Sequence, residues 1–71
     1  MGKLEILAEI EGFEDVNSML EEASFDSVAA SICTNKGCDY TAQLEPDCRD
    51  GYCEVCRTQS VSSCLVIMGI I

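Results

Sequence analysis

The residues of this sequence best suited to chemistry are its cysteines, since the chain of 71 residues contains six of them and no histidine. They stand at Cys33, Cys38, Cys48, Cys53, Cys56 and Cys64. Thiols gathered in so short a stretch can bind a metal ion, close disulfides or carry out redox reactions. A domain of this size also needs a staple, because its core alone rarely contributes more than about 3–5 kcal/mol to folding.

Two close pairs of these cysteines have the spacing of a metal site. Cys33 and Cys38 flank four residues, and Cys53 and Cys56 flank two, so each pair can wrap a turn and present both sulfurs to one ion. A structural zinc ion takes four such ligands in a tetrahedron, with Zn–S distances of about 2.3 Å. The spacing therefore predicts one zinc ion bound by Cys33, Cys38, Cys53 and Cys56. Iron in the same geometry is an alternative, because metal loading also depends on availability.

Other uses of the cysteines stay open from the residues alone. The segments CTNKGC and CRDGYC share the Cys-x4-Cys pattern, so Cys48 could replace a neighbour as a ligand. Four cysteines could also hold an iron–sulfur cluster, and six could pair as disulfides, including a Cys48–Cys64 bond. Outside a metal site, we expect Cys64 to be a small buried hydrophobe. We expect Cys48, beside Arg49, to be an exposed thiol with a lowered pKa.

The ends of the chain indicate the compartment in which these thiols would sit. The N-terminal segment MGKLEILAEIEGFEDVNS carries several acids and lacks the apolar stretch of a secretory signal. The apolar run 64–71 is far shorter than the roughly 20 residues of a membrane span. The sequence therefore predicts a cytoplasmic protein without membrane association. Thiols there are usually reduced, which favours metal binding over disulfides.

The two halves of the chain differ in net charge. Residues 1–32 carry eight acids against one lysine, a net charge of −7, and residues 33–71 carry five acids against three bases, a net charge of −2, which together give −9. Nucleic-acid backbones would be repelled by such a surface, because Lys and Arg drive phosphate binding. A basic protein partner would be attracted. The acids that we expect to contact it are Glu11, Glu14, Glu21 and Glu22.

Helices are expected to form the acidic half. Residues 3–23 place apolar side chains three or four apart, which is typical of one buried helical stripe. Gly12 should interrupt this run, leaving a short first helix and a second over about 13–23, with Phe13 packed at its start. Ser24 is a plausible cap for a short turn over 25–30.

Strands are expected to carry the cysteine pairs. Residues 39–45 alternate apolar and polar side chains, which predicts a half-buried strand that Pro46 ends. The fourteen residues between Cys38 and Cys53 leave room for a strand, a turn and a return. Residues 60–71 are compatible with a helix capped by Ser60 or with a buried strand, and we favour the helix. This segment should pack into the core or join two copies of the chain.

These elements predict a single small α+β domain over residues 1–71 that a metal ion staples. Acidic helices would occupy residues 1–31. A rubredoxin-like zinc ribbon with four cysteine ligands, followed by an apolar C-terminal helix or strand, would occupy residues 32–71.

Several short motifs carry a resemblance to a family. A cysteine is followed by an aromatic residue and threonine at 38–41, EPD stands at 45–47, GYCE at 51–54 opens the C-x2-C pair, and the chain ends in an apolar segment. In these features residues 13–71 resemble small zinc-ribbon-like proteins of marine bacteria and tailed phages, a family of uncharacterised function. The resemblance implies metal ligation at Cys33, Cys38, Cys53 and Cys56. Many zinc ribbons have glycine after C-x2-C, whereas this chain has Arg57, which argues against a left-handed turn there.

The function expected from these observations is structural. A site of four cysteines is coordinatively closed, whereas catalytic zinc keeps an open position, so we do not expect an enzyme. We expect a zinc-binding protein, phage-encoded or regulatory, that acts as an acidic protein–protein interaction module. One alternative is a nucleic-acid-binding zinc ribbon that uses Lys36, Arg49 and Arg57. A further alternative is thiol redox chemistry or metal handling at Cys48.

Overall fold

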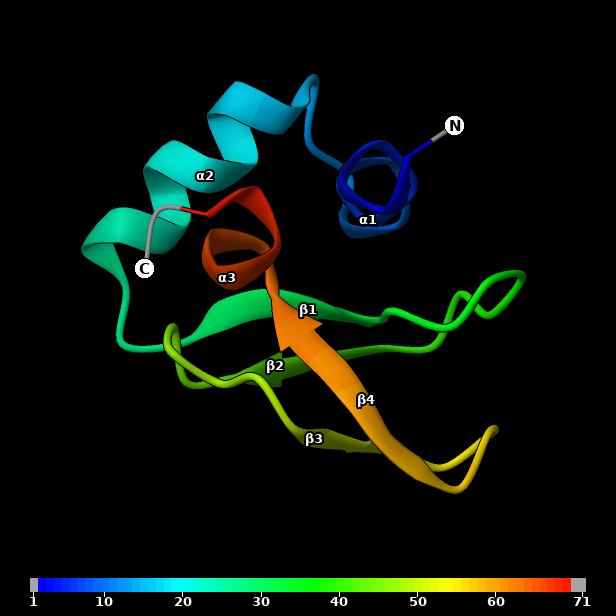
Figure 1. Cartoon of the computed structure of the whole chain (residues 1–71). Coiled ribbons are helices and arrows are strands. Elements are labelled where there is room, and N and C mark those ends of the chain that lie inside the picture. The colour runs from blue at the N-terminus through cyan, green and yellow to red at the C-terminus, as the bar shows by residue number, and fades with distance from the viewer. Residues whose placement is uncertain (1, 70–71) are drawn as a thin grey trace.

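The computed structural model describes residues 2–69 of the chain, which form three helices and one antiparallel sheet. The elements in chain order are α1 (Lys3–Glu11), α2 (Val16–Phe25), β1 (Ala29–Cys33), β2 (Thr41–Leu44), β3 (Gly51–Cys53), β4 (Thr58–Ser63) and α3 (Cys64–Met68). The strand order is β2-β1-β4-β3. The three helices lie over one face of the sheet (Figure 1). This is the small α+β arrangement with two N-terminal helices that the sequence predicts.

The main core lies between the helices and β1. Its buried members are Leu7, Ala8, Met19, Leu20, Ala23, Ala29, Ala30, Ile32, Cys64 and Leu65. These side chains come from all three helices and from one strand, so residues from both halves of the chain share this core. Burial of apolar surface stabilises the layer by roughly 25 cal/mol per Å².

The two N-terminal helices separate where the sequence predicts a break. Gly12 adopts a left-handed φ of 82° and caps the C-terminus of α1, with its N–H directed to helix carbonyls. The second helix begins at Val16 instead of residue 13, because Asp15 is its N-cap and accepts a hydrogen bond from the Ser18 N–H at 2.8 Å. That bond, and interaction with the Ser18 side chain, lower the pKa of Asp15. Phe13 lies before the cap and packs against the main core.

The predicted turn after the second helix is wrong, and the first strand was not foreseen. Ser24 lies inside α2, where its hydroxyl donates to the Leu20 carbonyl at 2.9 Å, so it caps nothing. The helix continues to Phe25, and β1 then starts at Ala29. All five residues of β1 are buried because it lies inside the sheet beneath the helices. A strand buried on both faces has no apolar–polar alternation by which to recognise it.

The C-terminal part of the chain contains both a strand and a helix. Ser60 lies in β4 and does not start a helix. The helix α3 begins at Cys64, and its cap is Ser63, whose hydroxyl accepts from the Val66 N–H at 3.2 Å. The prediction of a helix from Ser60 is therefore wrong in its start. Residues 70–71 of that prediction lie outside the described part of the chain.

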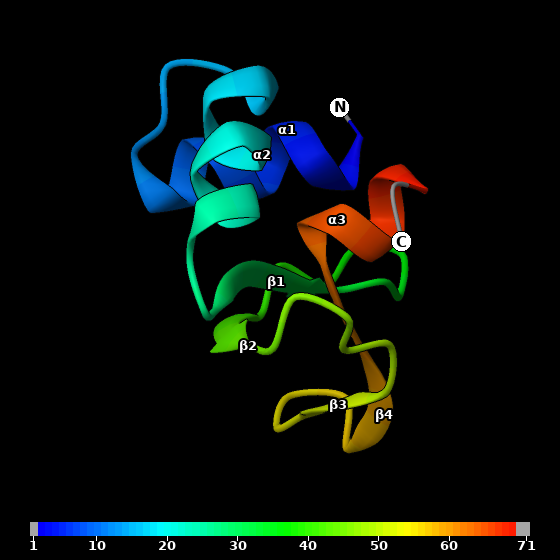
Figure 2. The same ribbon diagram turned by 90° about the vertical axis from the view of Figure 1, so that its left-hand side faces the viewer.

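The sheet curls at its β3 edge, which bends away from the helices in Figure 2. The strand predicted at 39–45 is present as β2. Gly51, the first residue of β3, lies so close to its neighbours that an added Cβ would stand 2.5 Å from Leu44 Cδ1 and 3.1 Å from Val61 Cβ. The lack of a side chain at Gly51 thus lets β3 approach β2 and β4 together. A second, smaller core forms here from Cys33, Cys53 and Val61.

Candidate metal centre

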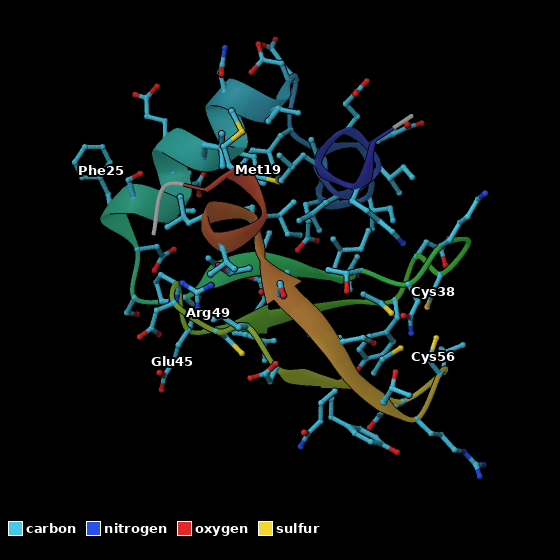
Figure 3. All side chains as sticks on the ribbon, viewed as in Figure 1. Met19, Phe25, Cys38, Glu45, Arg49 and Cys56 are labelled. Carbon is cyan, nitrogen blue, oxygen red and sulfur yellow. The ribbon has the colours of Figure 1, made fainter. Side chains whose placement is uncertain are left out.

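Two loops carry the paired cysteines to the same end of the sheet. The first cysteine loop (residues 33–38) follows β1, and the second cysteine loop (residues 53–56) follows β3. Because β1 pairs antiparallel with β4 and β4 with β3, β1 and β3 run in the same direction and their ends lie together. Figure 3 shows Cys38 and Cys56 facing one another from these two loops. Strand order thus brings together residues that lie far apart in the sequence.

The four sulfurs have the spacing of a tetrahedral metal site. The Sγ atoms of Cys33, Cys38, Cys53 and Cys56 all lie within 4.8 Å of one another. The Cys33–Cys56 sulfurs are 3.9 Å apart and the Cys38–Cys53 sulfurs 3.7 Å apart. Four sulfurs at about 2.3 Å from a central ion would be about 3.8 Å from each other. The group can therefore hold one metal ion.

Backbone N–H groups point at these sulfurs. The Cys56 N–H donates to Cys53 Sγ at 3.3 Å. The Asn35 backbone N–H donates to Cys33, and the Tyr40 backbone N–H donates to Cys38. Such bonds stabilise a thiolate, the form in which cysteine binds metal. The local fold of each loop thus prepares its sulfurs for a cation.

The thiols of Cys33 and Cys38 differ in how readily they ionise. Burial raises the pKa of Cys33, but hydrogen bonds from the Ser60 hydroxyl, the Asn35 N–H and neighbouring thiols outweigh it and lower this pKa to about 6. The Tyr40 N–H lowers the pKa of Cys38, yet burial and the adjacent thiols prevail and raise it to about 12. Cys33 therefore loses its proton readily, whereas the neighbouring thiols oppose the loss of a proton from Cys38. A bound cation would remove this opposition, because it neutralises charge within the cluster.

A left-handed residue closes each loop. Gly37 has a φ of 83° in the first cysteine loop, and Arg57 has a φ of 58° directly after the second. The expectation that Arg57 disfavours such a turn is wrong. The Arg57 N–H donates to the Cys53 carbonyl at 2.7 Å, which holds the turn in this conformation despite the side chain.

Lys3 connects α1 to the first cysteine loop. Its Nζ donates to the Asn35 carbonyl at 2.6 Å and also to the Cys38 carbonyl. Four thiolates around a divalent ion would leave a net charge of about −2, so a cation beside the loop also offsets charge. The contact spans 35 residues of sequence. No motif around Lys3 marks it, and sequence reasoning missed it.

Cys48 and Cys64 are not part of the cluster. Among residues 2–69, the thiols within reach of one ion exclude both. Cys48 is half-buried in the turn before β3, where its N–H donates to the Glu45 carbonyl at 2.9 Å and its carbonyl accepts from Ser63. Cys64 is buried in the main core as expected, and burial raises its pKa. All six cysteines are free thiols, so the structure contains no disulfide among them, and Cys48 lies outside the group of sulfurs close enough to share one ion.

A scan against protein-family models and searches of curated proteins and solved structures found no match to this chain. Within residues 2–69, every helix is too short or too polar to cross a membrane.

Proposed function

We propose that Cys33, Cys38, Cys53 and Cys56 bind one zinc ion as a structural staple, in the manner of a zinc ribbon. The observation that carries this proposal is the mutual distance of the four sulfurs, all within 4.8 Å. Backbone N–H groups aimed at three of them add support, because they favour thiolates over neutral thiols. Iron would fit the same four sulfurs, and cellular supply would then decide the metal.

The staple has a definite structural task. The core at the metal end contains only three buried residues among those described, Cys33, Cys53 and Val61. So small a cluster contributes little hydrophobic stability, whereas structural zinc contributes folding free energy directly. Four cysteine ligands would complete a tetrahedron and leave no position for a substrate. We therefore propose a structural role for the metal and not an enzymatic one.

We further propose that the stapled domain is an interaction module whose acidic helical layer binds a basic protein. Seven of the eight acids in residues 1–32 are exposed. They are Glu5, Glu9, Glu14, Asp15, Glu21, Glu22 and Asp26. Charges of one sign on one layer raise the local concentration of oppositely charged partners and speed their association.

Nucleic-acid binding is a second candidate, which two exposed cations favour. Lys36 stands on the first cysteine loop and Arg57 directly after the second, and both side chains are exposed. Tyr52, which is 54% exposed, lies in the adjacent β3 and could stack on a base. Binding of this kind would weaken steeply as salt rises, and a shift assay at two salt concentrations would detect it.

The test of the proposed staple is native mass spectrometry of protein purified without added metal, together with alkylation of accessible thiols. We expect one zinc per chain, and we expect Cys48 to be modified while the four ligands are protected. Iron would appear as a different mass and as colour. A metal-free protein with all six thiols alkylated would refute the staple, and with it the proposed role of the domain.

A further inference from the structure

A groove lies between α1 and α2, and its floor is apolar. Its volume is about 580 Å³. Ala8 of α1, Phe13 of the connecting segment and Val16 of α2 form the floor. Ala8 is buried, and the other two are half-buried side chains packed on the main core. The groove therefore has an apolar floor that is backed by the main core.

Carboxylates form the rim of this groove. Glu5, Glu9, Glu14 and Asp15 line it, and all four are exposed. Asp15 already accepts a hydrogen bond as the cap of α2, whereas the side-chain carboxylates of the other three make no hydrogen bond or ion pair with a residue within 2–69. No Lys or Arg lines the groove. The apolar floor is thus surrounded by negative charge that the described chain does not neutralise.

We propose that this groove binds a short segment of a partner protein in which an apolar side chain is flanked by Lys or Arg. The apolar side chain would cover Ala8, Phe13 and Val16, and the flanking cations would meet Glu5, Glu9 and Glu14. This proposal rests on the proposed function and names the chemistry of the partner. Of the four acids that the sequence predicts to contact a basic partner, only Glu14 lines this groove.

Those four acids lie in different places. Glu14 lines the groove. Glu11 and Glu22 line a different depression, between α2 and the sheet, where the Gln43 amide donates to Glu11. Glu21 lies beside Glu22 on the outer side of α2, around the exposed Phe25. The four acids are therefore dispersed, and only one of them borders the apolar floor.

Other occupants fit the groove less well. The exposed rim would leave a small molecule largely in contact with water, whereas ligand pockets bury most of their ligand. Nucleic acids and anionic membranes would be repelled by the rim carboxylates. A second copy of the chain would bring a net charge of −9 to the same surface. A cationic segment with an apolar anchor satisfies both the floor and the rim.

The test uses the full chain as purified and a synthetic peptide in which leucines are flanked by lysines. Two control peptides replace either the leucines by serine or the lysines by glutamate. Affinity is measured by fluorescence anisotropy, and the contact surface is mapped by amide chemical shifts. The paired variants are Glu9→Lys/Glu14→Lys in the groove and Glu21→Lys/Glu22→Lys on the outer side of α2. Both change the net charge equally.

We expect the largest shifts at Ala8, Phe13 and Val16. We expect about a tenfold loss of affinity in the groove variant and less than about a twofold loss in the outer variant, because charge reversal acts most strongly at direct contacts. Both control peptides should bind more weakly. Equal losses in the two variants, shifts elsewhere, or no binding by the unmodified chain would overturn the groove. If the chain holds zinc but binds the peptide elsewhere, the groove is refuted and the proposed function stands. If the chain holds no metal, the proposed function itself is refuted.

Discussion

Replacement of Arg57 by glycine should stabilise this protein, although arginine is the native residue. Arg57 adopts a φ of 58° in the turn that follows Cys56. An L-residue with a side chain pays roughly 1–2 kcal/mol in the left-handed region. Glycine does not carry this cost, but it gives the unfolded chain more freedom, worth about 0.4–1 kcal/mol. The Arg57 side chain is exposed, so little packing is lost. The net gain should be about 0.5–1 kcal/mol.

The reciprocal change at Gly37 is the matched control. Gly37 has a φ of 83° in the first cysteine loop, and nothing lies within 4 Å of a Cβ placed there. Gly37→Ala therefore isolates the backbone cost, and we expect a loss of about 1 kcal/mol. One variant removes a side chain from a residue with positive φ and the other adds a Cβ to such a residue, each four positions after the first cysteine of its pair. Their stabilities should move in opposite directions.

The assay is thermal unfolding by circular dichroism at one fixed excess of zinc, because bound ligand raises the midpoint by mass action. For a domain of this size, about 1 kcal/mol shifts the midpoint by about 4–8 °C. We expect Arg57→Gly to raise it by about 2–8 °C and Gly37→Ala to lower it by a similar amount. A lower midpoint for Arg57→Gly would refute the reasoning, since it would mean that the arginine side chain contributes more than its backbone costs.

Three further predictions concern the sheet, the lysine contact and the protons of the site. Gly51→Ala should lower the free energy of unfolding by about 1–3 kcal/mol, because its Cβ would overlap Leu44 and crowd Val61; urea unfolding with an unchanged midpoint would contradict this. Lys3→Met should weaken zinc binding about tenfold, because outer contacts tune metal affinity; chelator competition measures it, and unaltered affinity would argue against the contact. Zinc binding at about pH 7 should release fewer than four protons, because the lowered pKa of Cys33, about 6, leaves that thiol largely ionised before the metal binds. Calorimetry in buffers of different ionisation enthalpy counts the protons, and a release of four at this pH would contradict the lowered pKa. Below about pH 6, Cys33 takes up its proton, so the release should approach four while zinc binding weakens.

Local features of the chain were predictable from the sequence because their causes are local. Two cysteines within a few residues must share one loop, so Cys33 with Cys38 and Cys53 with Cys56 could be paired by spacing alone. Gly12 ends a helix because glycine adopts positive φ at little cost, and this too needs no distant partner. The alternation that marks β2 depends on one buried face and one exposed face of a single segment.

Tertiary structure alone decided the features that depend on distant parts of the chain. The sequence determined which thiols share a loop, but strand order determined that both loops meet at one end of the sheet and that Cys48 stays outside the cluster. The strand β1 was not predicted because helices and neighbouring strands bury all five of its residues, so its sequence lacks the apolar–polar alternation of a half-exposed strand. The contact of Lys3 with the first cysteine loop and the groove between α1 and α2 likewise arise only when the helices pack on the sheet. Spacing encodes what neighbours in sequence can do, whereas burial and long-range contact are properties of the folded chain.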